Sequence, residues 1–229
     1  MGAQWKHAGR LASSAAKGKV FSRLAKEIIV AAKAGPDPAL NARLRAAVEA
    51  AKKASMPRDT LERAIKKGAG LLDEKASYET VIVEGFAPHR VPVIVECLTD
   101  NTKRTMTNVR HAFRNGQLTP VAWDFNHVGL VDATPPADAD HEEAAIEAGA
   151  QDCELDGEGG VHFYTEPHDV DAVSKALSGM GLTVAAMRIG WRSKNPVKLD
   201  DAARTEVEKI LAELDEDDDV QHIYVGLES

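Results

Sequence analysis

Residues 80–98 read TVIVEGFAPHRVPVIVECL, and they decide the fold class of the middle of the chain. Two runs of mostly β-branched residues, 80–84 and 91–98, lie on either side of Gly85 and Pro88. Valine and isoleucine favour the pleated, half-buried surface of a sheet, whereas glycine and proline interrupt regular structure. The stretch therefore predicts two neighbouring strands joined by a turn.

The residues after this strand pair predict a helix and then two further short strands. Asp100 or Asn101 can cap the helix, because either side chain accepts a hydrogen bond from the first helical N–H groups. Residues 121–125 and 128–131 are apolar runs around Asn126-His127, a pair that suits a hairpin turn. We expect these segments to belong to the same sheet as the first two strands.

Two linker signals divide the rest of the chain: Thr134-Pro135-Pro136 and Asn195-Pro196. Between them, helix and strand patterns alternate over residues 141–150, 161–164, 170–177 and 183–191. After the second linker, residues 202–214 predict a helix and residues 220–227 a strand. A lone helix and strand cannot bury a core, so we expect them to return to the sheet of residues 78–132.

The N-terminal part of the chain predicts three or four short helices. Its first apolar stripe repeats every three or four residues, at Val20, Phe21, Leu24, Ile28 and Ala31. Gly35-Pro36-Asp37-Pro38 separates this stripe from a second helix, with Asp37 as the expected N-cap and Leu40 at the start of the apolar stripe. Ser55-Met56-Pro57 precedes a last helix, which Gly68 is expected to end.

We therefore predict an α+β fold with three domains. A basic, all-α helical domain covers residues 1–75. Residues 76–132 together with 200–229 form a second domain, of the α+β class, and residues 133–199 form a third α+β domain that is inserted in the second. Both α+β domains are expected to be small α/β sandwiches of the ferredoxin-like kind.

The composition is that of a folded protein. Of the 229 residues, 44% are hydrophobic but only 5% are aromatic, so we expect cores of aliphatic side chains. No run of about 18 apolar residues is present and the start is polar, which predicts neither a transmembrane helix nor a signal peptide. The two cysteines, Cys97 and Cys153, lie far apart, and a disulfide framework is not expected. These features predict a cytoplasmic protein with no membrane partner.

Charge is distributed very unevenly along the chain, whose formal net charge is −8. Residues 1–70 hold 15 Lys and Arg against 5 Asp and Glu, a net charge of +10. Residues 71–229 hold 13 against 31, a net charge of −18. Such asymmetry is typical of a polyanion-binding module attached to an acidic body. The alternative interpretation is a small helical domain with a solvated, lysine-rich surface.

The candidate binding residues are the cations of this N-terminal part. On a helical wheel, Lys19, Arg23 and Lys26 lie opposite the apolar stripe, so this face is expected to meet phosphates. The full set predicted to bind nucleic acid is Lys6, Arg10, Lys17, Lys19, Arg23, Lys26, Lys33, Arg43, Arg45, Lys52, Lys53, Arg58, Lys66 and Lys67. The later cations scatter around their helices, which favours contacts to backbone phosphates over readout of bases.

A second, weaker candidate lies on the helix after Asn101. Lys103, Arg110 and Arg114 cluster beside the apolar face of that helix and are candidates for a secondary contact with the same ligand. Arg110 and Arg114 also suit a structural role, because cations near a helix C-terminus offset its dipole.

Signatures of enzymes and metal sites are missing from the sequence. It contains no GxxxxGK[ST], GxGxxG or GxSxG motif. His141-Glu142-Glu143 lacks the second histidine of an HExxH zinc helix, and His162 with His168 has no cysteine partner. The acidic run 215–219 is more typical of a solvated loop than of a cation site. We therefore predict no enzymatic activity, no cofactor, no metal and no small-molecule substrate.

Several long runs resemble the YebC/PmpR family. They are MGAQWK at the start, KGKVFSRLAKEI (17–28), PDPALNARLRAAVEAAKKASMPRDTLERAIKKGAG (36–70), VEGFAPHRVPVIVECLTDNTKRT (83–105) and HEEAAIEAGAQD (141–152). The resemblance implies a cytoplasmic three-domain protein, with a basic helical N-terminal domain and two α+β domains, one inserted in the other. Members of this family are mostly described as probable transcriptional regulators that bind DNA. Others are mitochondrial translational activators or ribosome-associated factors.

The chain also departs from the family pattern. It opens Gly2-Ala3-Gln4-Trp5, where most members have Gly-His-Ser-Lys-Trp. Ala87-Pro88-His89-Arg90 stands where a Gly-rich turn is usual, and the loop of residues 116–120 is short. The basic helices keep the family pattern. The leading prediction is a DNA-binding transcriptional regulator. The alternative is a translation factor that binds ribosomal or transfer RNA, because the phosphates of DNA and of RNA bind the same cationic side chains.

Overall fold

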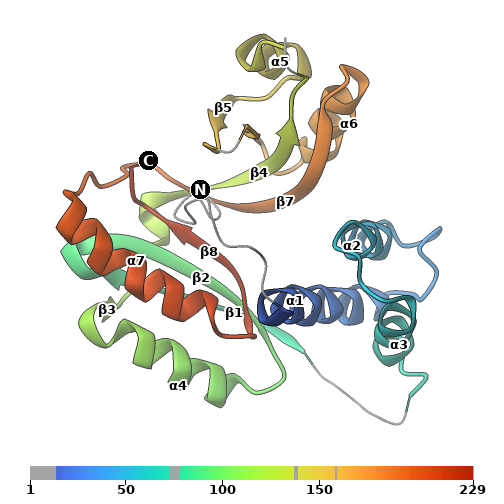
Figure 1. Cartoon of the computed structure of the whole chain (residues 1–229), viewed down its shortest axis with the longest axis horizontal. Helices are drawn as coiled ribbons and strands as arrows, with labels where there is room; N and C mark the ends of the chain where they lie inside the picture. Colours follow the sequence, from blue (N-terminus) through green and yellow to red (C-terminus); the bar gives the residue numbers. More distant parts are fainter. Residues whose placement is uncertain (1–13, 73–77, 137–138, 158, 229) are drawn as a thin grey trace.

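The computed structural model describes residues 14–72, 78–136, 139–157 and 159–228 (Figure 1). These residues form seven α-helices and two four-stranded antiparallel sheets. The α+β fold class predicted from the sequence is therefore confirmed. None of the described helices is long and apolar enough to span a membrane.

The N-terminal helices, which we call the helical unit, are α1 (Ser14–Ala32), α2 (Ala42–Lys53) and α3 (Arg58–Gly68). They share one apolar core, in which Ile28 of α1 meets Leu44 and Ala51 of α2. Among the described residues, this cluster draws only on the three helices and the turns between them, with Tyr78 added from the chain that follows. The helical unit therefore buries its own core without help from either sheet.

The start of α2 differs from the prediction. Asn41, and not Asp37, is the N-cap, because its side-chain oxygen accepts the Leu44 N–H at 3.0 Å. Asp37 instead accepts the Ala39 N–H at 2.9 Å within the preceding turn. Leu40 consequently lies outside the helix, and it is 89% exposed and not part of the apolar stripe.

Gly68 is the last residue of α3, as the sequence predicts, and it also serves close packing. A Cβ atom at this position would lie 2.2 Å from the carbonyl oxygen of Ile29 and 2.8 Å from the Cβ of Ala32. Only glycine therefore lets α3 approach α1 this closely. The left-handed residue beyond the helix is Gly70, with a φ of 70°.

The first sheet contains β1 (Glu79–Ala87), β2 (Val91–Thr99), β3 (Gln117–Leu118) and β8 (Val220–Val225), in the order β3-β1-β2-β8. Helices α4 (Thr102–Ala112) and α7 (Asp201–Asp215) cover one of its faces. Alternate strand residues such as Val93 and Val95 point into this core, where they meet Val109 and Leu211. Short 3₁₀ turns lie at Pro88–Arg90, Phe113–Asn115 and Ala122–Asp124.

The first sheet does not have the predicted ferredoxin-like connectivity. Its central strands β1 and β2 are consecutive and form a hairpin, with Val83 opposite Val95. In a ferredoxin-like βαββαβ sheet, a helix and an edge strand separate the two central strands. Here only the tight turn at Pro88–Arg90 lies between them, which leaves no room for a helix.

The second sheet contains β4 (Phe125–Thr134), β5 (Asp152–Leu155), β6 (Val161–Thr165) and β7 (Thr183–Ser193), in the order β5-β6-β4-β7. Helices α5 (His141–Ala148) and α6 (Val170–Gly179) connect the strands and close a core with Val131, Phe163 and Leu177. The sequence of elements from β4 to β7 and their order in the sheet are ferredoxin-like.

The predicted hairpin around Asn126-His127 is wrong, because β4 is one continuous strand. Both residues pair with β7, where His127 lies opposite Trp191 with ring centroids 4.8 Å apart. Their side chains are exposed, so this polar pair fits within a strand and needs no turn. The strand also belongs to the second sheet, and not to the first as the sequence suggests.

The faces of the two sheets that carry no helices meet in a further apolar cluster. Ile94 and Tyr224 of the first sheet pack there with Leu130 and Tyr164 of the second. Gly190 permits the approach, because a Cβ atom there would lie 2.8 Å from both Leu130 Cδ1 and the Tyr224 ring. Apolar contacts therefore hold the two sheets together.

Candidate nucleic-acid interface

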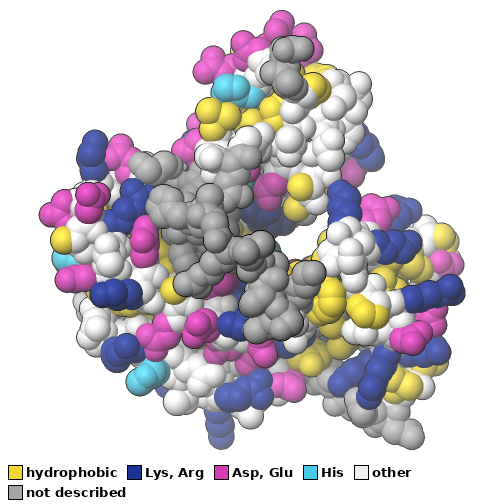
Figure 2. Space-filling view, in the orientation of Figure 1, with side chains coloured by type: hydrophobic (Ala, Val, Ile, Leu, Met, Phe, Trp, Pro, Cys, Tyr) yellow, Lys and Arg dark blue, Asp and Glu magenta, His cyan; other side chains and the backbone are white. Residues whose placement is uncertain are grey.

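Lys and Arg side chains gather over α2 and α3, whereas Asp and Glu side chains crowd the tip of the second sheet around α5 (Figure 2). The predicted binding residues with exposed side chains in the helical unit are Lys33, Arg43, Arg45, Lys52, Lys53, Arg58 and Lys66. Lys19 and Lys67 are half-buried. Lys6 and Arg10 lie outside the described residues, and of Lys17 only the backbone within α1 is described.

Two cations of α1, Arg23 and Lys26, do not face open solvent, which corrects the prediction of a free face opposite the apolar stripe. Arg23 donates from Nη1 to Asp215 Oδ1 at 3.0 Å, and Lys26 donates from Nζ to Asp219 Oδ1 at 2.6 Å. The two cationic side chains are only 18% and 12% exposed. The acidic loop, residues 215–219 at the end of α7, therefore covers this face of α1.

Main-chain oxygens of the acidic loop take part as well. Arg23 Nη2 donates to the carbonyl oxygen of Asp215, the last residue of α7, at 2.6 Å. Lys26 Nζ donates to the carbonyl oxygen of Asp218 at 2.7 Å. The carbonyl end of a helix carries partial negative charge and attracts cations. Thus α1 meets α7 with charges of opposite sign.

Asp219 is fixed by the body of the protein as well as by Lys26. Its Oδ2 accepts hydrogen bonds from Arg104 Nη2 at 2.7 Å, from Thr105 Oγ1 at 2.7 Å and from Thr99 Oγ1 at 3.1 Å. Burial alone would disfavour its charged form, yet the hydrogen bonds from Lys26, Arg104 and Thr105 lower the pKa of Asp219 to about 2. The carboxylate is therefore ionised throughout the physiological range.

Acid is expected to weaken this site. The pKa of Asp219 is about 2 in the folded protein against an ordinary value of 3.8. Its charged form thus contributes stability above about pH 4, and this contribution is lost as the pH falls toward 2. In urea unfolding, Asp219→Asn should show a weaker dependence on pH over this range than the wild type. The same pH dependence in both proteins would contradict the assignment.

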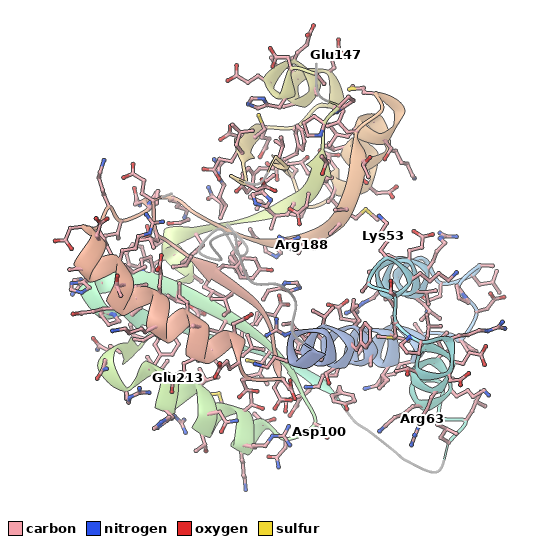
Figure 3. All side chains as sticks on the ribbon, in the orientation of Figure 1. Lys53, Arg63, Asp100, Glu147, Arg188 and Glu213 are labelled. Carbon is pink, nitrogen blue, oxygen red and sulfur yellow. The ribbon has the colours of Figure 1, made fainter. Side chains whose placement is uncertain are left out.

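Two further cations join the helical unit to the chain beyond it. Lys33 Nζ donates to the carbonyl oxygen of Tyr78 at 3.1 Å, and Lys53 Nζ donates to that of Val184 in β7 at 2.8 Å. Figure 3 shows Lys53 reaching from the end of α2 toward the second sheet. The hydrogen bonds described at this boundary therefore run from cations of the helical unit to oxygen atoms of the sheets and the acidic loop.

The boundary between the helical unit and the sheets also contains ionisable side chains that are buried away from water. Burial raises the pKa of Glu27 on α1 and that of Glu96 on β2, and Arg43 and Arg188 oppose the effect at both. His222 lies opposite Glu96 in the first sheet. Burial, together with nearby arginines, lowers the pKa of His222 to about 3, so its ring is neutral. The helical unit thus meets the sheets through polar groups.

Arg45 and Lys52 are the clearest candidates for contact with phosphates. They are seven residues apart on α2 and therefore lie on the same side of the helix. Both side chains are exposed, and neither forms a hydrogen bond or ion pair with any residue that the structure describes. Arg58, by contrast, already pairs with Glu62 at 2.7 Å. Arg45 and Lys52 can thus bind an anion without giving up a partner.

The structure divides the second predicted set, on and after α4. Lys103 and Arg110 are exposed. Arg114 donates from Nη1 to Glu213 Oε1 of α7 at 2.7 Å, and so it connects the two helices on the first sheet. The structural interpretation therefore applies to Arg114.

Two cations were missing from the predicted set. Arg104 binds Asp219, and it also pairs with Asp100 at 3.0 Å, so it positions the acidic loop. The signal in the sequence is that Arg104 follows Asp100 by four residues at the start of the helix, a spacing that favours an ion pair. Arg63 is exposed on α3 between the predicted cations of that helix, and Figure 3 shows it pointing away from the sheets.

His162, considered from the sequence as a zinc ligand, and Cys97 both lie in structural environments. His162 Nδ1 lies 2.7 Å from Asp132 Oδ1, and Asp132 also pairs with Arg188. Burial raises the pKa of Cys97 to about 12, which keeps its thiol protonated. Within the described ranges, no group of three or more His, Cys, Asp or Glu residues is placed to hold a metal ion.

Two protein-family descriptions match this chain, one after the other. Residues 3–71 match the "TACO1/YebC protein N-terminal domain". Residues 78–227 match the "TACO1/YebC second and third domain". The two matches together span the helical unit and both sheets.

Curated bacterial proteins are similar over their whole length. A "probable transcriptional regulatory protein" of Pseudomonas syringae pv. tomato is 57% identical over 232 residues and is covered, like this chain, to 99%. One from Bdellovibrio bacteriovorus is 48% identical, with 99% of this chain and 100% of the relative covered. The crystal structure of a conserved hypothetical protein from Aquifex aeolicus has a TM-score of 0.87 at 40% identity, over 99% of this chain and 96% of that one.

Proposed function

Because this chain belongs to the TACO1/YebC family, we propose that it is a regulatory protein that binds DNA through the exposed cations of α2 and α3. The names of its relatives support a role in transcription. In this proposal the protein acts by binding, with no catalytic step and no cofactor.

The observation that carries the proposal is the separation of charge between the helical unit and the rest of the chain. Residues 1–70 have a net charge of +10 and residues 71–229 one of −18. At physiological salt, charges act over a Debye length of about 8 Å, so the acidic sheets repel phosphates near them. A polyanion is thereby directed to the helical unit.

The contacts expected are mainly to phosphates. The exposed cations lie on several sides of α2 and α3, whereas readout of base edges needs side chains along one face that enters a groove. Phosphate contacts supply affinity that falls steeply with salt and depends little on sequence. Binding by the helical unit should therefore respond to salt more than to base composition.

Neutralising Arg45 and Lys52 together should weaken binding to duplex DNA. If each cation neutralises one phosphate, Arg45→Gln/Lys52→Gln should flatten the slope of log K against log salt by about 1.8. Titration of a fluorescent duplex between about 50 and 200 mM salt measures this slope. Both side chains are exposed, so the melting temperature should stay near that of the wild type.

The matched control is Lys175→Gln/Lys198→Gln, which removes the same charge from exposed positions outside the helical unit. This pair should leave the slope close to that of the wild type. An unchanged slope in the α2 variant, or an equal loss in the control, would place the binding surface elsewhere.

Sedimentation of cell lysate through a sucrose gradient tests DNA against RNA as the partner. RNA phosphates attract the same cations, so a ribosome-associated translation factor is the alternative within this family. The proposal expects the protein to sediment apart from ribosomes. If it migrates with ribosomes and ribonuclease abolishes this, RNA replaces DNA as the partner.

A further inference from the structure

The proposed function does not explain why two cations of α1 bind the acidic loop. Arg23 and Lys26 belong to the part of the chain with the excess of positive charge, yet both bind the acidic loop. We propose that Arg23 and Lys26 form a second phosphate-binding surface, which the acidic loop occupies until nucleic acid displaces it. The inference rests on the proposed function, since it assigns a regulated contact to the same nucleic-acid partner.

The acidic loop presents to α1 the same chemistry as a nucleic-acid backbone. Arg23 and Lys26 each donate to a carboxylate oxygen and to a carbonyl oxygen, at 2.6–3.0 Å. Phosphate oxygens accept hydrogen bonds from the same guanidinium and ammonium groups at similar distances. Displacement therefore exchanges one set of oxygen acceptors for another.

The loop does not depend on α1 for its own structure. When Lys26 leaves Asp219, the carboxylate still accepts hydrogen bonds from Arg104, Thr105 and Thr99. Asp215 is 29% exposed, so water reaches its carboxylate when Arg23 departs. Opening thus leaves no buried charge without a partner on the loop side, which removes the largest penalty for breaking an ion pair.

The contacts between the helical unit and the sheets favour separation of the two. The apolar core of the helical unit is closed within that unit, Tyr78 apart, among the residues the structure describes. Separation therefore exposes little apolar surface, and polar boundaries of this kind permit relative motion of domains. Glu27 and Glu96 gain water on opening, because burial at the closed boundary raises the pKa of both. Lys33 and Lys53 exchange carbonyl oxygens near the surface for water.

The test compares Asp215→Asn with Asp217→Asn in the full-length protein. Both variants remove one negative charge from the acidic loop. Asp217, however, accepts hydrogen bonds from Asn108 of α4 and from the Asp219 N–H, and it forms no hydrogen bond or ion pair with α1 among the described residues. Asp215→Asn weakens the hold on Arg23 and should tighten binding to a short DNA duplex about fivefold more than Asp217→Asn does. Circular dichroism confirms that both variants fold.

A third variant shows which surface gains the ligand. In Arg23→Gln/Asp215→Asn the charged contact between Asp215 and Arg23 is gone, but α1 has also lost one of the cations that would bind phosphate, so the gain should disappear. Equal affinities of Asp215→Asn and Asp217→Asn would overturn the inference, and so would a gain that survives Arg23→Gln.

The same titrations separate this inference from the proposed function. If the wild type binds DNA and the α2 variant weakens it, the proposed function stands whatever the loop variants do. If only Asp215→Asn binds, both the function and the covered surface are supported. If neither the wild type nor Asp215→Asn binds duplex DNA or RNA at low salt, the proposed function fails and the inference fails with it.

Discussion

Asp132→Ala is expected to lower the free energy of unfolding by about 3–5 kcal/mol. Asp132 pairs with Arg188 and with His162, and these partners hold its pKa at about 2 in spite of burial. The side chain of Arg188 is only 18% exposed, and its Nε has no hydrogen-bond partner among the described residues. Removing Asp132 leaves that guanidinium charge without its counter-ion in a poorly hydrated place. Urea unfolding at neutral pH measures the loss.

Two further variants show why Asp132→Ala is expected to lower the stability. Asp171→Ala also breaks an ion pair, with Lys175, but that aspartate is 60% exposed. It should change stability by no more than about 0.5 kcal/mol. Replacing both members of the buried pair, as in Asp132→Ala/Arg188→Met, should recover much of the loss, because no unpaired charge remains. A double variant as unstable as Asp132→Ala would show that the pair itself, and not the orphaned charge, supplies the stability.

Gly68→Ala should destabilise the helical unit by about 2–3 kcal/mol, although alanine is the better helix former. The added methyl group would lie 2.2 Å from the carbonyl oxygen of Ile29, which is backbone and cannot rotate away. Helices α1 and α3 must then move apart, and the packing around Ile28 loosens. Thermal unfolding followed by circular dichroism measures the loss.

Gly18→Ala is the matched control for this substitution. Gly18 lies in α1, and a Cβ atom there would have no neighbour within 4 Å among the residues that the structure describes. The same change should therefore stabilise the protein, by up to about 1 kcal/mol, through helix propensity alone. If both variants shift the melting temperature in the same direction, the close packing of α3 against α1 does not require glycine at position 68.

The sequence predicts those parts of the fold that local patterns determine. The β-branched runs around Gly85 and Pro88 predict β1 and β2, which the structure pairs as a hairpin. The period of three to four apolar residues predicts α1, in which Ile28 is fully buried. These signals lie within one element or between neighbours, so no knowledge of distant segments is needed to read them.

The errors concern contacts between distant segments. A helical wheel shows that Arg23 and Lys26 point away from the apolar stripe of α1, but not what lies on that side. The partner of Arg23 is 192 positions away, and no local pattern connects the two. The sequence shows a run of five acidic residues at 215–219. Its composition does not distinguish a solvated loop from a loop that binds a basic helix. The choice of sheet by β4 is missed for the same reason, since an apolar strand fits either sheet.

The place of β8 in the first sheet has a consequence for how the chain folds as it is made. β8 is the last strand of the first sheet to be synthesised, yet it pairs with β2, which is made long before it. The helical unit and the second sheet are complete in sequence by residue 193, so both can fold while translation continues. Until β8 emerges, the apolar strand β2 has an unpaired edge, and α1 lacks its acidic loop. A product truncated before Val220 would keep that edge open, and an open edge of this kind recruits strands from other chains.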